Sequence, residues 1–582
     1  MNEAYRRLGH ALPERRAGAP AAIASDARSL RGWIDALPMA NFATASKRLL
    51  EGLRGLNRQR LDGAQRLEAL ETLRVPGAQL AAATDKQIVG ASFPLPAQKT
   101  ELGELALAFQ HELATGYRCA LAELCAPAGA VPFLRGRQVA LAATRALQHA
   151  AAHLAKAYLL YRTPPDGVWQ ALHDVHAFIA SVRLADRDVD DSLQAGGGNA
   201  RAAYLQALLV ALANPYRFTQ REQADLVAFA RALAPHAQLR TRGVAPDDIP
   251  FDELADRGPG YLPEERANVQ HDVRALHLDP AFAFVEGQLA MLPPGAHMAV
   301  FRVRGDNPVL VDADLVQRIL AGWRPRGERV HVRLGGGYVL DSVLGLHDLH
   351  FALAGGEDFD SFMRHVRGQV IHLSESDRAA PWRISASEPG RGGHLPARVL
   401  DQGLGGYRLL WERGEGGETA RARVAELVGL ALPERTRDAQ PDWMVGVIRW
   451  LRIDEQGRVD AGVELLARRA LPIGVRVPGD DRRGWMRGLL LAPLNADGGP
   501  DYDTLLVSTE IDRTADELEL TVPVDLQGPP MPARSECVAG LRLLEASGIC
   551  RHFALPRAAE TPEAGASDRA DESMTEALEP GS

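Results

Sequence analysis

The spacing of apolar residues changes once along this chain, and that change limits what its 582 residues can fold into. Between residues 41 and 236 apolar side chains recur every three or four positions, as at Leu49, Leu53 and Leu56, which is the period of an amphipathic helix. After Phe284 polar and apolar residues alternate, as they do in β-strands. We therefore expect a multidomain α+β protein, with an N-terminal all-α helical bundle or solenoid before a small mixed domain and C-terminal β-structure.

Composition shifts divide the chain further, because 582 residues are too many for one hydrophobic core. The run Thr219-Gln-Arg-Glu222 has the pattern of a capping box, in which each side chain bonds the other residue's backbone N–H, and it predicts that a helix begins there. The expected segments are a helical domain at 1–240, a linker at 241–283, a small mixed α/β domain at 284–370, a β-barrel at 371–480, a second β segment at 481–556 and a disordered acidic tail at 557–582.

Charge and residue usage argue against several classes of function. A net charge of −9 disfavours a general nucleic-acid binder. The sequence has no apolar run long enough for membrane insertion and no Cys-x-x-Cys spacing, so we expect a cytoplasmic protein. No lysine follows Lys156, which leaves the rest of the chain without a P-loop, Schiff-base or kinase-type lysine. We expect no catalytic residue, cofactor or metal.

A glycine-rich turn leading into a strand is the most informative local motif. It is the run Asp401-Gln-Gly-Leu-Gly-Gly-Tyr-Arg-Leu-Leu-Trp411, whose aromatic and leucine residues alternate after the last glycine. Glycine turns of this kind let a backbone approach a ligand closely. Arg378 and Arg383 lie upstream, and arginine offers a planar, charged fork for phosphate and a flat face for a purine base.

The order of these elements resembles the PilZ domain, a small six-stranded β-barrel best known as a bacterial receptor for cyclic di-GMP. The ligand motif of that family is Arg-x-x-x-Arg followed by Asp/Asn-x-Ser-x-x-Gly. Asp401 and Gly406 match the motif, whereas Gly403 replaces its serine, and Arg378 and Arg383 are one residue further apart than the family's arginines. The resemblance implies a barrel at about residues 380–477. Its expected strand residues are Tyr407, Leu409, Val447, Val463 and Leu465.

The resemblance also implies a ligand site and a role. The expected ligand-binding residues are Arg378, Arg383, Asp401, Gly403, Gly406 and Arg449. The arginines would hold the phosphates and Asp401 would accept hydrogen bonds from a guanine edge. The implied protein is a bacterial cytoplasmic signalling receptor or adaptor that regulates a partner protein in motility, surface polysaccharide or virulence outputs.

Other interpretations stay open at this point. Asp401 is equally suited to a structural role in which its side chain hydrogen-bonds to the backbone of its own turn. Arg449 is equally suited to a position at a strand edge, where its charged group would extend into water. A barrel without the motif serine would act as a protein-interaction module that no longer binds nucleotide. A metal-dependent hydrolase would instead use one of two His-Asp-x-His clusters, His173–His176 or His347–His350, although the sequence indicates no third ligand for either.

Overall fold

The structure is a computed structural model. It describes residues 3–16, 23–193, 197–240, 247–260, 274–293, 295–302, 308–324, 333–367, 394–412, 420–433, 441–480, 483–494, 504–523 and 534–556. Within these ranges, no helix combines the length and the apolar character needed to cross a membrane. The chain forms two compact units, one of residues 1–344, 392–435 and 446–465, the other of residues 345–391, 436–445 and 466–582. The predicted tail at 557–582 lies outside the described residues.

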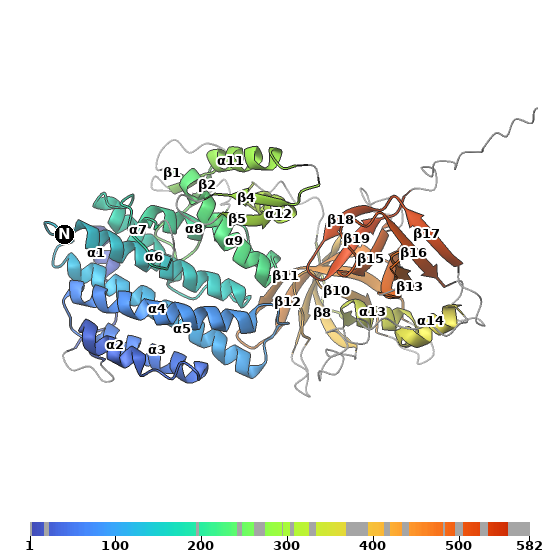
Figure 1. The fold of residues 1–582 in the computed structure, drawn as a ribbon, viewed down its shortest axis with the longest axis horizontal. Helices are drawn as coiled ribbons and strands as arrows, with labels where there is room; N and C mark the ends of the chain where they lie inside the picture. The colour runs from blue at the N-terminus through green and yellow to red at the C-terminus, as the bar shows by residue number, and fades with distance from the viewer. Residues whose placement is uncertain are drawn as a thin grey trace, which may run out of the picture. The chain divides into compact units, whose positions relative to one another are not determined.

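The first unit opens with an array of helices that lie side by side (Figure 1, blue to green). The helices are α1 (Glu3–Leu8), α2 (Ala27–Asp35), α3 (Phe42–Arg58), α4 (Gly63–Ile88), α5 (Ala97–Leu124), α6 (Gly136–Leu159), α7 (Val168–Ser181), α8 (Ala200–Leu212) and α9 (Gln220–Leu233). The predicted helix start at Thr219 is confirmed, because its side chain accepts from the Glu222 N–H and Glu222 accepts from the Thr219 N–H. The predicted all-α N-terminal part is therefore present.

Buried arginines tie this array together. Arg145 of α6 is 1% exposed, and its guanidinium donates to Asp191 at 2.8 Å, to Glu71 at 3.1 Å and to the Asp190 carbonyl at 2.8 Å. The Asp191 carboxylate also accepts from Arg74 at 2.8 Å. Burial alone would raise the pKa of Asp191, but the hydrogen bonds from Arg74 and the Leu193 N–H and the nearby Arg145 charge hold that pKa below its usual value. The buried charges of Arg74, Arg145 and Asp191 are therefore paired with one another.

A small mixed region continues the first unit. It contains β1 (Gln238–Arg240), β2 (Ile249–Phe251), β3 (Arg274–His277), α11 (Asp279–Ala290), β4 (Met298–Phe301), β5 (Val309–Asp312) and α12 (Ala313–Trp323). Strands β1, β3 and β2 form one sheet and β4 pairs with β5. The region packs on the helices, since the Trp323 indole stacks on Phe229 and donates to the Leu209 carbonyl at 3.0 Å.

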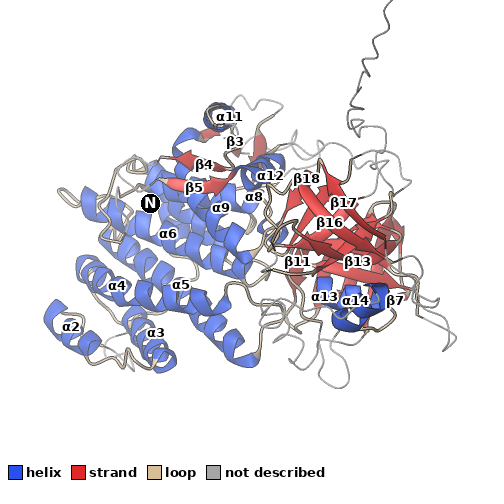
Figure 2. Cartoon of the chain, turned by 45° about the vertical axis from the view of Figure 1, so that its right-hand side comes forward, coloured by secondary structure: helices blue, strands red, loops and turns tan. Residues whose placement is uncertain are grey.

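Six strands of the first β-structure close into a barrel (Figure 1, Figure 2). They are β7 (Val339–Leu344), β8 (Leu395–Gly403), β9 (Gly406–Trp411), β10 (Leu427–Ala431), β11 (Met444–Ile453) and β12 (Val459–Ala467). Their order is β8-β7-β10-β11-β12-β9, and β9 pairs back with β8 to close the ring, while the short β6 (Leu334–Gly335) adds to β8 from outside. The barrel prediction is thus confirmed, with all five of its named strand residues in β9, β11 or β12.

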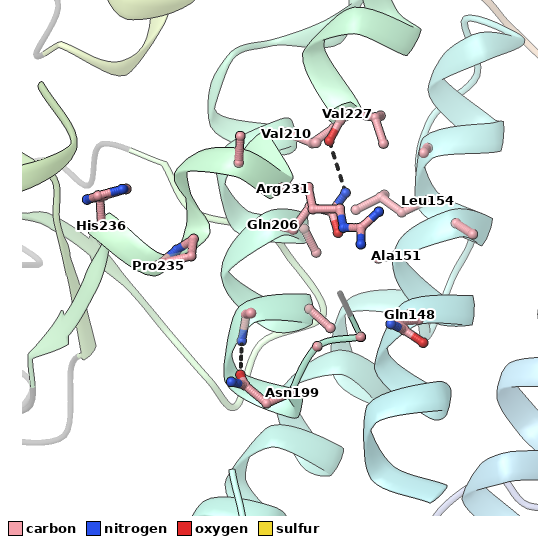
Figure 3. Close-up of a pocket in the computed structure, with 18 of the residues that line it drawn as sticks. Gln148, Ala151, Leu154, Asn199, Gln206, Val210, Val227, Arg231, Pro235 and His236 are labelled. Atoms are coloured by element: carbon pink, nitrogen blue, oxygen red, sulfur yellow. Dashed lines mark hydrogen bonds between the residues drawn. The ribbon is translucent and has the colours of Figure 1, made fainter. Parts of the chain in front are cut away.

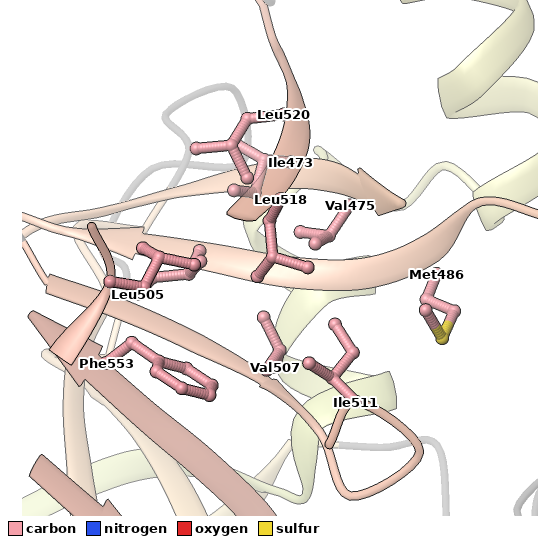
Figure 4. Close-up of a cluster of buried hydrophobic side chains, with 10 residues drawn as sticks. Ile473, Val475, Met486, Leu505, Val507, Ile511, Leu518, Leu520 and Phe553 are labelled. Carbon is pink, nitrogen blue, oxygen red and sulfur yellow. The ribbon is translucent and has the colours of Figure 1, made fainter. Parts of the chain in front are cut away.

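A second curled sheet belongs to the other unit, with helices α13 (Leu346–Leu353) and α14 (Phe359–Arg367). Its strands are β13 (Ala470–Arg476), β14 (Met486–Leu491), β15 (Thr504–Ser508), β16 (Glu517–Val522), β17 (Arg534–Ala539), β18 (Arg542–Ala546) and β19 (Cys550–Ala554). Their order is β17-β16-β13-β14-β15-β19-β18. Figure 4 shows its buried core, in which Val475, Leu505, Leu518 and Phe553 converge.

The second sheet repeats the strand order of the barrel. Strands β17 and β18 are separated by only Gly540 and Leu541, so both ends of the sheet belong to one bent stretch of chain. If this stretch is matched to β11, the pairings of β13, β14, β15, β16 and β19 correspond one by one to those of β7, β8, β9, β10 and β12. The chain therefore carries two copies of one β-topology, and β14–β15 is the counterpart of the β8–β9 hairpin.

The observed strands cross the segment boundaries that we expected from the sequence in three places. The expected linker at 241–283 contains β2 and β3, because its Phe251 and Leu276 are buried despite the Pro, Gly and Asp content around them. The barrel takes β7 from the expected mixed domain at 284–370. Strand β13, expected at the end of the first barrel, instead pairs with β14 and β16.

Candidate functional site

The predicted glycine turn is the tip of the β8–β9 hairpin. Gly403 pairs with Gly406, which leaves a two-residue turn between them, and the Gly405 carbonyl accepts from the Leu465 N–H at 3.0 Å. Gly406 has φ of +151°, and a Cβ there would lie 2.0 Å from the Val463 carbonyl oxygen. The last glycine of the motif is therefore required by the close approach of β12.

A β-bulge places Asp401 beside this turn. In the β8–β9 register Val399 pairs with Leu409 and Asp401 pairs with Arg408, so Leu400 has no partner across the ladder. On the other side of the bulge, the Gly336 N–H donates to the Leu400 carbonyl at 3.0 Å. Bulges bend a strand and redirect its side chains, and they occur frequently next to binding sites. The bulge thus sets the direction of the Asp401 carboxylate.

The triglycine run 335–337 is part of this site rather than a free loop. The Gly337 N–H donates to the Val399 carbonyl at 2.8 Å, and a Cβ on Gly336 would lie 2.2 Å from that carbonyl oxygen. Gly337 has φ of +111°, which a residue with a side chain rarely adopts. The glycines therefore let the chain pass from β6 to β7 across the bulge.

Charged side chains surround the hairpin on both sides. Asp401 forms an ion pair with Arg333, which directly precedes β6. Arg408, opposite Asp401, donates both arms of its guanidinium to Asp460 at 3.0 and 2.7 Å. The site thus holds a carboxylate that is half-buried and already paired with a more exposed arginine.

The predicted site residues fall into three groups in the structure. Asp401, Gly403 and Gly406 lie together in the β8–β9 hairpin. Arg449 lies on β11 and pairs with Glu464, which is opposite Gly406 in the β12–β9 register. Arg378 and Arg383 lie outside the described residues.

Sequence reasoning missed Arg333 as a site residue. The sequence did contain a signal for it, because Arg329 and Arg333 have the Arg-x-x-x-Arg spacing of the family motif. Arg333 lies 68 positions before Asp401, whereas Arg378 and Arg383 lie much closer to it in the sequence. Of this pair the structure describes Arg333.

Stacked aromatic and arginine side chains connect the barrel to the helical array. The Arg408 guanidinium lies 5.9 Å from the centre of the Trp450 ring. Arg452 lies 6.0 Å from the same ring and 4.4 Å from the ring of Tyr216, which follows α8. The Ile453 N–H then donates to the Tyr161 carbonyl at 2.9 Å. The site and the helical array thus share a continuous set of contacts.

Gly462 makes this stack possible, so Gly462→Ala should destabilise the protein. A Cβ at Gly462 would lie 1.9 Å from the Trp450 Nε1, and the indole would have to move. We expect the free energy of unfolding to fall by about 1–3 kcal/mol, as for other overpacked sites. Denaturant unfolding measures this change. The control is Gly405→Ala, where a Cβ meets nothing within 4 Å; equal stability of the two variants would contradict the stack's role.

The two histidine clusters are engaged by protein groups. His173 is hydrogen-bonded to Tyr204 at 2.7 Å and to the Arg257 carbonyl at 3.0 Å. His350 is bonded to the Ile473 carbonyl at 3.3 Å, and burial lowers its pKa to about 3. Within the described ranges, no three His, Cys, Asp or Glu side chains are grouped so that they could hold a metal ion. The clusters therefore give the metal-dependent alternative no support in this part of the chain.

Comparison with known proteins agrees with this architecture. Residues 28–245 match the family model described as the N-terminal domain of the cyclic-di-GMP receptor FimW, and residues 386–472 match the model of its middle PilZ domain. The cyclic-di-GMP receptor FimW of Pseudomonas aeruginosa is 25% identical over 528 residues, which cover 81% of this chain and 82% of that protein. The PilZ match falls on β8 to β12 of the closed barrel. The chain therefore belongs to the PilZ-domain proteins.

Proposed function

We propose that this protein is a receptor for cyclic di-GMP and that the nucleotide binds at the β8–β9 hairpin of its closed barrel. The observation that carries the proposal is the placement of Asp401 by a bulge, next to a glycine turn and in contact with Arg333. The similarity to the cyclic-di-GMP receptor FimW across most of the chain supports the choice of nucleotide. The second sheet has Leu489, Leu490 and Leu491 on the strand that corresponds to β8, so the proposed site is confined to the first barrel.

The residues of the site have complementary tasks. Asp401 would accept hydrogen bonds from the N–H groups of a guanine edge, and Arg333 would turn from Asp401 to a phosphate. This exchange keeps both charges paired, because the ligand supplies N–H donors to the carboxylate and an anion to the guanidinium. Gly403 lets the ligand approach the backbone, while Gly406 lets β12 pack against the hairpin and so holds its shape. Arg449 adds positive charge on β11, which β12 separates from the hairpin. Arg378 and Arg383 are proposed as further phosphate ligands.

The proposal is tested by calorimetric titration of Asp401→Ala with cyclic di-GMP. Loss of the guanine acceptor should weaken binding at least tenfold, since a hydrogen bond to a charged group contributes about 1.5–3 kcal/mol. Asp460→Ala is the matched control, because Asp460 pairs with Arg408 on the neighbouring strand and has no assigned ligand contact. Equal binding by wild type and Asp401→Ala would remove Asp401 from the site.

Gly403→Ser should tighten cyclic di-GMP binding by restoring the family's hydroxyl. Strand β8 extends to Gly403, and the positive φ of this hairpin lies at Gly406, so the backbone conformation at 403 does not require glycine. A hydroxyl that donates to phosphate should improve affinity several-fold, at about 1 kcal/mol for one hydrogen bond. Gly403→Ala supplies the matched control in the same titration. An equal effect of alanine and serine would show that the hydroxyl makes no such contact.

We propose further that the protein is a non-catalytic, cytoplasmic receptor that regulates a partner protein with an output in motility, surface polysaccharide or virulence. The contacts from Arg408 through Trp450 and Arg452 to Tyr216 support a role for the helical array in that output, because they join it to the nucleotide site. The second candidate is a PilZ-like interaction module without nucleotide. Gly403 favours it, because the motif serine is missing.

A further inference from the structure

A cavity of about 520 Å³ opens in the helical array, away from the barrel. It lies among α6, α8 and α9, and the helices that face it carry alanine, including Ala151 of α6 and Ala203 and Ala207 of α8. Short side chains on facing helices leave this space. Its volume falls in the range of about 300–1,000 Å³ that is typical of small-molecule sites.

A few polar groups converge in this otherwise apolar space. Figure 3 shows Arg231 of α9 and Gln206 of α8 next to each other in its middle, facing α6. The Gln206 amide donates to the Val227 carbonyl at 3.0 Å, which holds the side chain in place. Gln148 of α6 provides a further amide on the opposite wall.

The charge of the cavity is positive. Its lining includes Arg231 and Arg302, whereas the one carboxylate in the lining, Asp188, accepts a hydrogen bond from Asn199 at 3.0 Å. A guanidinium matches a carboxylate in shape, with two parallel N–H donors for its two oxygens. The alanine walls would meanwhile remove an aliphatic chain from water.

We propose that this cavity binds a small aliphatic carboxylate, with the anionic head at Arg231 and the chain along the alanine walls. The site is separate from the hairpin of the barrel and gives the helical array a ligand of its own. Binding requires both parts of the ligand, since the cavity offers arginine side chains and an apolar surface.

The proposal is tested by calorimetric titration of the full chain with octanoate. Octanoate should bind saturably with one molecule per chain, whereas acetate, which lacks the chain, and octylammonium, which reverses the charge, should not. Hexanoate should bind roughly tenfold more weakly, because it buries two fewer methylene groups. Absence of saturable octanoate binding, or equal binding of octylammonium, would overturn the proposal.

Three variants locate the site. Arg231→Gln should weaken octanoate binding about tenfold or more through loss of the charge-assisted contact. Ala151→Leu should also weaken it by filling the cavity. Arg201→Gln is the control, since this α8 arginine pairs with Asp186 outside the cavity lining. Circular dichroism verifies that each variant is folded. Equal octanoate affinity in Arg231→Gln and Arg201→Gln would refute the site. Titrations of the same variants with cyclic di-GMP test the nucleotide site of the barrel separately.

Discussion

Replacing Arg145 with alanine should lower the free energy of unfolding by about 3–5 kcal/mol, the cost expected when one partner of a buried ion pair is removed. The side chains of Arg145 and Asp191 are each 1% exposed, and the same guanidinium also bonds Glu71 and the Asp190 carbonyl. Its removal leaves the buried Asp191 carboxylate with only Arg74 as a charged donor. Chemical denaturation followed by circular dichroism measures the change.

The matched control is Arg201→Ala. Arg201 also pairs with an aspartate through two N–H donors, but the side chains of Arg201 and Asp186 are 40% and 69% exposed. Exposed ion pairs contribute about 0–1 kcal/mol, because water and salt screen them. If Arg145→Ala lowers the free energy of unfolding by less than 1 kcal/mol, or if both variants lower it equally, then burial does not strengthen the Arg145 ion pair.

Replacing Arg333 with alanine should weaken cyclic di-GMP binding by about tenfold or more. In the proposed site Arg333 exchanges its ion pair with Asp401 for a contact with phosphate, and each charge-assisted contact contributes about 1.5–3 kcal/mol. The double variant Arg378→Ala/Arg383→Ala should also weaken binding by an order of magnitude or more if both residues hold phosphate. The two variants are compared with wild type by calorimetric titration at fixed ionic strength, because salt screens such contacts.

Arg458→Ala is the control for this comparison. Arg458 lies in the turn between β11 and β12 and pairs with Asp454 four residues earlier, so its loss removes one positive charge from the barrel without touching the hairpin. Its affinity for the nucleotide should equal that of wild type. A tenfold loss in Arg333→Ala alone would exclude Arg378 and Arg383 from the site, and a loss in the double variant alone would exclude Arg333.

Local patterns of sequence predicted the local structure of the site. Asp401 and Gly406 were found because a glycine turn followed by alternating residues specifies a hairpin within a few residues of chain. The capping box at Thr219 was identifiable for the same reason, since both of its hydrogen bonds form within four residues.

Pairings between distant segments were not predictable in this way. Between β7 and β8 lie 50 residues that carry α13 and α14, so alternation alone could not show that β7 completes the barrel. Arg333 reaches Asp401 only because β6 pairs with β8 across the same insertion. Strand β13 follows β12 after two residues, yet it pairs in the other sheet, and its own sequence does not distinguish the two partners.

The central claim is that the β8–β9 hairpin is a cyclic di-GMP site, and a calorimetric titration of the wild-type chain with this nucleotide tests it most directly. We predict saturable binding that falls as salt is raised, because two phosphates must meet fixed positive charge. The missing motif serine predicts an affinity below that of barrels with the intact motif. Absence of heat and of saturation at high micromolar nucleotide would contradict the receptor, and the nucleotide-free interaction module would take its place.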